Sequence, residues 1–528
     1  MIAALTSILS RTVLAQADTT LAGAVGTAGE IAPATLPDLV TPHVDWMSIA
    51  PVSFLIGGAL LLVVVGSLAR HTTWIRKVYV WFTCVTAIVA ALFTIPLWDR
   101  VSHGRATPTI ANAVNVDGFG VFVTVLICIA VVMAVLIADG YLTRESLQGP
   151  EFYALTLLSA SGGVIMATAN DLIVLFLGLE ILSIALYILA GSQLRRAESQ
   201  EAALKYFVLG GFSSAVFLYG VALTYGATGT TNLTEITTFL ADNIILKNGL
   251  LTAGLALLLV GLCFKIAAVP FHMWTPDVYQ GSPSPVTGFM AAAAKAAGFA
   301  GLLRVLMTAM ISRRLDWQPI IWVLAVVTMI VGSVLAAAQT DIKRMMAYSS
   351  ISHAGFILIG VQAASNDGVA GALFYLLAYT FIVLGTFAII TVVGRRGDAA
   401  HSLDNYKGLS QRSPVLAITF TLFLLAQAGI PVTSGFTAKF GVIRAAVDSH
   451  SYAIAIIAML TSVIGGYFYL KVIVQMYQRD PDADSAPVGS LVVPIGTRIV
   501  LVAAVGFTLF AGVIPQTLID FAHKAVLK

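Results

Sequence analysis

Long uninterrupted runs of apolar residues fill most of this chain, and they decide what it can fold into. A helix of about 20 apolar residues crosses the hydrocarbon core of a bilayer. A transmembrane β-barrel would instead show short segments of alternating hydrophobicity. The sequence therefore predicts an all-α polytopic membrane protein with about 14 transmembrane helices. The predicted spans lie near 48–69, 76–98, 117–138, 150–169, 171–193, 200–225, 249–269, 285–309, 318–338, 343–363, 368–394, 414–445, 452–478 and 497–515.

The composition excludes a soluble protein and a nucleic-acid-binding protein. Of the 528 residues, 58% are hydrophobic and 10% are charged, whereas soluble domains are about 25% charged. The net charge is only +3, and the basic residues are scattered among loops, so no nucleic-acid partner is expected. The bilayer itself is the expected surrounding.

The loops also indicate orientation. Assigning them alternately to the two sides of the membrane gives an excess of Lys and Arg on the side that holds Arg195, Arg196, Arg395 and Arg396. Because basic loops stay inside, both termini are expected outside. The opening residues MIAALTSIL are apolar, but Arg11 interrupts them and no basic segment precedes them, which argues weakly against a cleaved signal peptide.

Two prolines divide the later part of the chain. Pro270 and Pro431 each fall within a predicted span, where proline removes a hydrogen-bond donor and breaks the helix. Broken helices in corresponding places indicate internal repeats around a transport path. We expect a tail, three helices, two inverted antiporter-like repeats of five helices and a last helix, at 1–47, 48–138, 150–309, 318–478 and 497–515.

Charged residues lie inside several predicted spans. Glu180 is about ten residues from either end of its span, and so about 15 Å from water. Lys265 directly precedes the first break, Lys295 lies among alanines and glycines, Lys439 follows the second break, and Lys205 lies near the start of its span. Each such charge costs roughly 2.5–3.5 kcal/mol at a helix centre, so an intramembrane function is the expected explanation.

A structural explanation competes with the functional one. These side chains can be inert pairs or can reach the membrane surface. That explanation fits Glu180, Lys265 and Lys295 poorly, because they are deep, and it fits Lys205 and Lys439 better. It is the preferred explanation for charges near a border, which are Arg304, Lys343, Arg344 and Lys471. For Arg304, Lys343 and Arg344, a structural contact between helices is the alternative to a place at the membrane surface.

Buried lysines suit proton transfer because their proton affinity responds strongly to burial and to a neighbouring carboxylate. Glu180 and Lys205 are on consecutive predicted helices and could form such a pair, with Lys265 and Lys295 passing the proton onward. His353 has serines nearby and can act as a relay. A hydrogen-bonded histidine between helices is an equally good interpretation.

Four strings carry a resemblance to a known family. They are LKYFVLGGFSSA, FKIAAVPFHMWTPDVYQGSPSPVTGFMAAAAKAAGFAGLLR, QTDIKRMMAYSSISHAGF and AGIPVTSGFTAKF. These strings resemble the antiporter-like subunits of bacterial NADH-quinone oxidoreductase, respiratory complex I, over about residues 150 to 480. The chain ends soon after its last span, without the long lateral helix of the L type, and Lys439 stands where the M type has a glutamate, so the N type fits best.

The resemblance implies roles for these residues. Glu180 and Lys205 would be the coupling pair, Lys265 and Lys295 the central relay, and Lys439 the residue near the exit. It also implies that NADH, FMN, iron–sulfur clusters and quinone bind partner subunits, among them sister antiporter-like subunits, in a bacterial inner membrane. No cofactor, metal or catalytic residue is expected in this chain, which has no G-x-G-x-x-G fingerprint and no cysteine cluster.

The sequence thus predicts a proton-translocating membrane subunit driven by redox chemistry in other subunits. One alternative is a subunit of a stand-alone cation/proton antiporter, which shares the helix pattern but performs no redox work. Another is a structural membrane scaffold, whose buried charges only fix the register of its helices.

Overall fold

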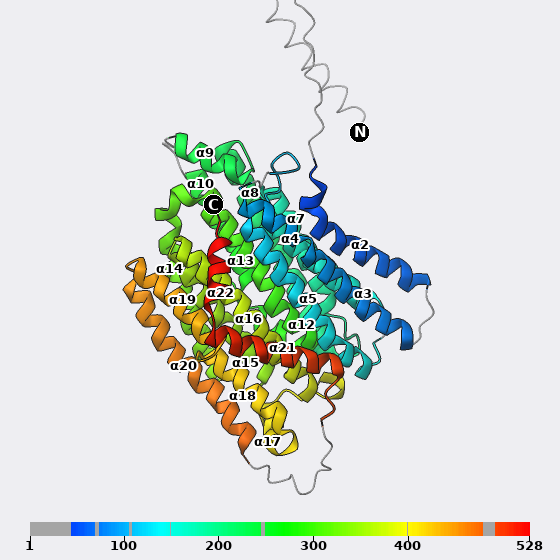
Figure 1. Ribbon diagram of the computed structural model, residues 1–528. Helices are drawn as coiled ribbons and strands as arrows, with labels where there is room; N and C mark the ends of the chain where they lie inside the picture. Colours follow the sequence, from blue (N-terminus) through cyan, green and yellow to red (C-terminus); the bar gives the residue numbers. More distant parts are fainter. Residues whose placement is uncertain are drawn as a thin grey trace, which may run out of the picture. The chain divides into compact units, whose positions relative to one another are not determined.

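A computed structural model describes residues 44–68, 73–104, 108–147, 149–243, 249–398, 400–478 and 491–527. Most of the predicted tail, residues 1–43, lies outside these ranges. The described residues are mainly helical (Figure 1), and their only β-pairing consists of isolated bridges. The expectation of an all-α protein is therefore confirmed.

The first half of the fold runs from α2 to α13. Its helices are α2 (Trp46–Leu68), α3 (Thr73–Leu92), α4 (Thr94–Ser102), α5 (Gly118–Arg144), α6 (Glu151–Thr168), α7 (Leu172–Ala190), α8 (Ala197–Thr228), α9 (Leu233–Asp242), α10 (Gly249–Ile266), α11 (Thr275–Gly281), α12 (Ser284–Phe289) and α13 (Lys295–Arg304). The π-helical turn η1 (Met290–Ala294) joins α12 to α13, and the turns η2 (Val305–Ala309) and η3 (Ile311–Arg313) follow α13.

The second half runs from α14 to α22. Its helices are α14 (Arg314–Ala337), α15 (Ile342–Gln362), α16 (Asn366–Val393), α17 (Leu409–Arg412), α18 (Pro414–Ala428), α19 (Ser434–Asp448), α20 (Tyr452–Tyr477), α21 (Ile495–Val513) and α22 (Gln516–Lys524). The short turns η4 (Arg396–Asp398) and η5 (Leu403–Tyr406) lie in the loop between α16 and α17.

Twelve helices of the described residues are long and apolar enough to cross a membrane. They coincide with twelve of the predicted spans. The predicted span 343–363 is the helix α15, which begins with two basic residues, and 414–445 is the helix pair α18 and α19. The total of about 14 spans and the inverted relation of the two repeats stay predictions.

Two segments form the centre of the helical unit. The most apolar part of 284–309 is wholly buried, and that of α16 is 94% buried. α16 contacts α5, α12, α15, α18, α19, α21 and α22. Since other helices cover the apolar parts of these two segments, polar side chains within those parts are shielded from lipid.

Glycines allow α14 and α15 to pack backbone to backbone. A Cβ atom at Gly332 would lie 2.5 Å from the backbone nitrogen of Ser352, and one at Gly355 would lie 2.7 Å from that of Met329. Small residues permit such close approach of membrane helices. The serine-rich face of α15 therefore packs closely against the backbone of α14.

Both proline-containing spans are interrupted. α10 ends at Ile266 and the next helix begins at Thr275, with Pro270 between them. α18 ends at Ala428 and α19 begins at Ser434, with Pro431 between them. The breaks leave carbonyl groups without helical partners inside the protein, where side chains can bind them.

Candidate functional site

Lys265 is buried at the end of α10, beside α7 and α8. Its ammonium lies 2.8 Å from the hydroxyl of Ser183 and 3.5 Å from that of Tyr206, and the residue is only 6% exposed. Glu180, one turn before Ser183 on α7, interacts with Lys265 electrostatically. A hydroxyl and a carboxylate on one face of α7 therefore serve the same ammonium.

The carboxylate of Glu180 is only partly satisfied. The residue is half-buried, and its Oε1 atom is buried without a hydrogen-bond partner among the described residues. A buried acceptor left unpaired is costly. This oxygen is therefore a place where a proton, a water molecule or a neighbouring chain can bind.

Aromatic side chains wall off the Lys265 ammonium. The ring of Tyr206 stacks on Trp274, with the centroids 4.5 Å apart and the planes 8° from parallel. Trp274 Nε1 donates a hydrogen bond to the carbonyl of Phe264, at 3.1 Å, just before the helix break. The hydrogen bond at the interruption of α10 thus holds the pair of Tyr206 and Trp274 beside Lys265.

The helix α13, which carries Lys295, packs against the stem of Lys265. A Cβ atom at Gly298 would lie 2.9 Å from Ile266 Cγ2 and 3.2 Å from Lys265 Cγ. Lys295 precedes Gly298 by one turn on α13. The missing side chain at 298 therefore lets the stem of Lys265 lie against the helix that carries Lys295.

Lys295 is buried against α15 and directly follows the π-helical turn η1. Its ammonium donates to the carbonyl oxygen of Ser350, and it lies 2.6 Å from the hydroxyl of the same residue. The hydroxyl of Tyr279 is 3.4 Å from that serine hydroxyl, and the ring of Tyr379 is 5.5 Å from the ammonium. These contacts are neutral, and in the described part of the chain no carboxylate forms an ion pair with Lys295.

His353 lies one turn after Ser350 on α15 and has a hydroxyl partner at each ring nitrogen. Nδ1 is 2.7 Å from the hydroxyl of Tyr375, and Nε2 is 3.1 Å from that of Tyr469. The ring also interacts electrostatically with Lys295 and Lys439. The position fits both interpretations from the sequence, because this hydrogen-bonded histidine also lies between two lysines.

A polar branch leaves His353 through Tyr469. The tyrosine hydroxyl contacts the hydroxyl of Ser349 and lies 3.4 Å from Gln427 Oε1. Gln427 Nε2 in turn donates to Thr386 Oγ1 at 2.9 Å. Sequence reasoning missed Tyr469 and Gln427; the one signal for Gln427 was its place four residues before a span-breaking proline.

Lys439 uses the second helix break. Its ammonium donates to the carbonyl of Ala428 at 2.9 Å and to the hydroxyl of Ser462 at 3.0 Å, and it lies 4.7 Å from the ring centre of Phe356. Ala428 is the last residue of α18, so its carbonyl has no helical donor. The break at Pro431 thus supplies an acceptor for a buried cation.

The predicted pair of Glu180 and Lys205 is not formed, and that prediction was wrong. The ammonium of Lys205 lies 2.6 Å from Glu201 and 2.7 Å from Asp277, and its side chain is 41% exposed. Lys205 lies near the start of α8, and its partners Glu201 on α8 and Asp277 on α11 are partly exposed, so solvent lowers the cost of charge there. Lys265 is the lysine that faces Glu180.

Two residues expected near a border are in fact buried contacts between helices. Arg304 is 1% exposed and holds Asp117 with two nitrogens at 2.5 and 2.7 Å, while its Nε donates to the carbonyl of Ala167 at 2.9 Å. Lys343 is fully buried. Both residues are near the ends of their spans, so the sequence does not reveal that they are buried. Neighbouring helices, and not their depth in the membrane, shield these side chains from solvent.

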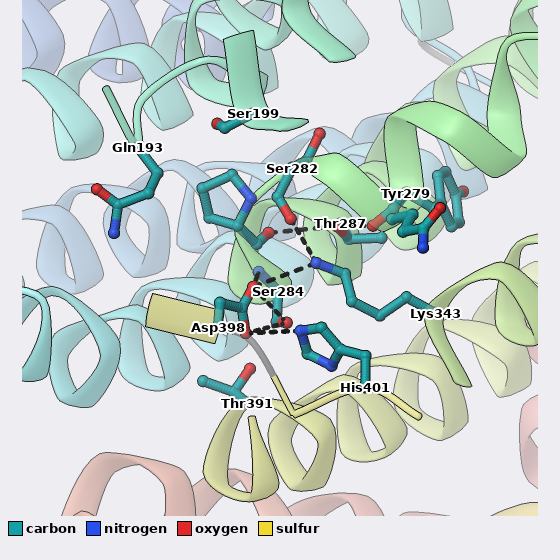
Figure 2. A network of polar contacts seen from close by, with 12 residues as sticks. Gln193, Ser199, Tyr279, Ser282, Ser284, Thr287, Lys343, Thr391, Asp398 and His401 are labelled. Atoms are coloured by element: carbon teal, nitrogen blue, oxygen red, sulfur yellow. Dashed lines mark hydrogen bonds and ion pairs between the residues drawn. The ribbon is translucent and has the colours of Figure 1, made fainter. Parts of the chain in front are cut away.

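Lys343 belongs to a charged cluster around Asp398 (Figure 2). The carboxylate, which is fully buried, lies 3.2 Å from Lys343 Nζ, 3.1 Å from His401 Nε2 and 3.5 Å from Arg196 Nη1. It also accepts hydrogen bonds from the backbone nitrogen of Ser284, at 3.1 Å, and from its hydroxyl, at 2.9 and 3.0 Å.

The charge state of Asp398 follows from these neighbours. Burial favours the neutral acid, but the ammonium of Lys343, the ring of His401 and the hydroxyl of Ser284 outweigh it. Together they hold the pKa of Asp398 well below its usual range. The loop therefore buries a carboxylate that stays ionised.

The family comparison covers most of this polar network. The family model described as NADH:quinone oxidoreductase/Mrp antiporter, TM, matches residues 169–465, more than half of the chain. That range contains all of the buried lysines discussed above.

Relatives of similar length match over nearly the whole chain. NADH-quinone oxidoreductase subunit N of Trichlorobacter lovleyi is 41% identical over 471 residues, which cover 89% of this chain and 94% of the relative. NADH-quinone oxidoreductase subunit N 1 of Herpetosiphon aurantiacus is 39% identical, covering 92% of this chain and 98% of the relative.

Solved structures share the fold. A chain of respiratory complex I from Thermus thermophilus with bound aureothin is 30% identical with a TM-score of 0.74, covering 90% of this chain and 99% of that chain. A chain of the Mrp complex from Dietzia sp. DQ12-45-1b is 20% identical with a TM-score of 0.79, covering 91% and 97%, and this likeness shows the fold alone. The chain belongs to the NADH:quinone oxidoreductase/Mrp antiporter membrane family and, within it, to the N subunits of NADH-quinone oxidoreductase.

Proposed function

We propose that this chain translocates protons as a membrane subunit of NADH-quinone oxidoreductase, through a relay that runs from Lys265 through Lys295 and His353 to Lys439. The observation that carries the proposal is the series of buried cationic or titratable side chains, each held by neutral hydroxyl or carbonyl groups. An inert ammonium would be expected beside a carboxylate. Neutral partners instead leave the lysine free to lose its proton.

Glu180 and Lys265 form the switchable pair of this relay. Glu180 interacts electrostatically with Lys265, whereas the hydrogen-bond partner of the ammonium, the hydroxyl of Ser183, is neutral. A change in the position or charge of Glu180 therefore changes the proton affinity of Lys265. Lys205, which pairs with Glu201 on α8 and Asp277 on α11, is outside this pair.

His353 and Lys439 continue the relay toward the second helix break. The imidazole faces both Lys295 and Lys439, and its two hydroxyl partners can donate to either nitrogen or accept from it. The segments 150–309 and 318–478 each hold one broken helix, which supports two inverted repeats with the relay running across both.

The redox chemistry takes place in partner subunits. The two relatives described above are named as subunits of NADH-quinone oxidoreductase, so FMN, the iron–sulfur clusters and quinone are proposed to bind other chains. Sister antiporter-like subunits are proposed as direct neighbours. The complex would lie in a bacterial inner membrane, with both termini of this chain outside.

Purification from the native membrane tests the assignment to the complex. The C-terminus is tagged, the membranes are solubilised gently, and the product is assayed for NADH:quinone reductase activity. Co-purified activity is the expected result. An antiporter-like assembly that purifies without NADH oxidation would contradict the proposal and favour a stand-alone cation/proton antiporter.

A further inference from the structure

Asp398 contacts two segments: the one that begins at Ser284 and carries Lys295, and the helix α15, which carries Ser350, the partner of Lys295. On one side it accepts hydrogen bonds from Ser284, the first residue of α12. On the other it binds the ammonium of Lys343, near the start of α15. The same ammonium donates to the carbonyl of Ser282 at 2.5 Å. One carboxylate and one ammonium thus join the two segments at this end.

The same two segments meet again at Lys295 and Ser350. Ser350 follows Lys343 by seven residues, two turns of α15, so the two side chains lie on the same face of that helix. Lys295 follows Ser284 by eleven residues, which is about 16 Å along a helix. The Asp398 cluster and the Lys295–Ser350 contact are therefore two links between one pair of segments.

The link at Asp398 matters because the segment between Ser284 and Lys295 is not a regular helix. The π-helical turn η1 ends directly before Lys295. A π-helical turn inserts a wider turn into an α-helix, and such turns occur frequently at functional sites. If the end at Ser284 were free, the segment could slide or rotate, and Lys295 would lose its alignment with Ser350.

Stability alone explains this cluster poorly. Asp398 and Lys343 are both fully buried, and Arg196 and His401 lie at 3.5 and 3.1 Å from the carboxylate. Burying such charges costs more than packing apolar residues of the same volume, and replacing them with apolar side chains is often neutral or stabilising. Buried charges are better explained where they fix the register of helices.

We propose that Asp398 is a positioning residue that anchors α12 and α15 to one point, so that Lys295 is held in contact with Ser350. This inference rests on the proposed function, because it gives Asp398 its effect through the relay lysine. Asp398 itself passes no proton.

The test uses the whole complex in proteoliposomes and the double variant Asp398→Asn with Lys343→Met. This variant removes the two fully buried charges together, and it keeps an amide oxygen near Ser284. Arg196, whose side chain is 17% exposed, still has Glu198 at 3.8 Å. We expect normal assembly, a fall of about two- to thirty-fold in NADH-driven proton pumping, and a shifted pH profile of pumping. The single variant Asp398→Asn should show the same defect together with lower stability.

The control is Asp404→Asn, in the same loop, whose carboxylate is 70% exposed and lies 2.6 Å from Lys407. It should pump as the unaltered protein does. A double variant that assembles and pumps with an unchanged rate and pH profile would overturn the proposal. Loss of assembly in both Asp398 variants would also overturn it, since the cluster would then serve only the fold.

A parallel variant, Lys295→Met, separates this proposal from the proposed function. If Lys295→Met abolishes pumping while the double variant pumps normally, only the positioning role fails. If Lys295→Met pumps normally, the relay itself fails.

Discussion

The hydroxyl of Ser183 accepts a hydrogen bond from the ammonium of Lys265 at 2.8 Å, and Glu180 lies one turn earlier on the same helix. The lysine therefore has a neutral hydrogen-bond partner and, on the same helix, a carboxylate with which it interacts electrostatically. A small movement of the Lys265 side chain toward or away from Glu180 changes how strongly the lysine holds its proton. This is the property that a relay needs and that a fixed ion pair lacks.

Replacing Lys265 with methionine is expected to slow proton movement without unfolding the protein. Methionine fills a similar volume and removes a buried charge, so assembly should be retained. NADH-driven pumping in proteoliposomes should fall by about tenfold, a difference of about 1.4 kcal/mol. Glu180→Gln should act in the same direction.

Lys471→Met is the matched control for this substitution. Its ammonium lies 3.5 Å from the carbonyl of Gln339, and the side chain is only partly buried. Pumping should stay unchanged in this variant. Unchanged pumping in Lys265→Met and Glu180→Gln would remove both residues from the relay.

A methyl group at position 298 is expected to disturb the packing of the Lys265 stem against α13, the helix that carries Lys295. The added carbon of Gly298→Ala would lie 2.9 Å from Ile266 and 3.2 Å from the stem of Lys265, so α10 and α13 must separate or the lysine must move. Pumping should fall while the complex still assembles. In Gly211→Ala, another helical position, the methyl group meets no atom within 4 Å, and pumping should be normal; equal pumping rates in the two variants would contradict the account.

Much of this architecture could be read from the sequence, for physical reasons. Apolar runs and prolines act locally, so the spans and the interruptions near Pro270 and Pro431 follow from short segments. The depth of Lys265 and Lys295 follows in the same way. The pairing of Lys205 with Asp277 did not follow, because Asp277 lies 72 residues away, beyond a helix break.

Burial by neighbouring helices was the other property hidden from the sequence. Lys343 and Arg304 are near helix ends, where water is normally close, yet other helices cover them. The hydroxyls of Tyr206 and Tyr469 were also missed, since aromatic residues are common in membrane spans and only the packing shows that one lies near Lys265 and the other at His353.

Removing the hydroxyl of Tyr469 is expected to decide the role of His353. If the histidine passes protons, Tyr469→Phe breaks the contact of Nε2 and slows pumping, with little effect on assembly. Tyr467→Phe, on the same helix with 64% of the residue exposed, should change nothing. Normal pumping in Tyr469→Phe, with stability lower by about 1 kcal/mol, would instead show a packing role.

The Asp398 cluster gives the stability of the complex a defined pH dependence. A carboxyl group whose pKa is lowered on folding stabilises the fold at every pH above its unfolded pKa of about 3.9, and this contribution is lost as the pH falls toward the folded pKa. The apparent Tm of Asp398→Asn should therefore be lower than that of the unaltered complex at pH 7 and down to about pH 4. Below that pH the difference should shrink, and a difference that grows on acidification would contradict the assignment.

The most direct test of the central claim is the number of protons pumped per NADH oxidised by complex carrying Lys295→Met. Proteoliposomes with matched content of the complex are supplied with NADH and quinone, and proton uptake and NADH oxidation are followed together. The ammonium of Lys295 is held by the neutral carbonyl and hydroxyl of Ser350 and lies over the ring of Tyr379, so replacing it with methionine should leave the complex assembled. We predict a lower ratio of protons to NADH than in the unaltered complex; an unchanged ratio at an unchanged rate of NADH oxidation would contradict the claim that protons pass through this chain by way of its buried lysines.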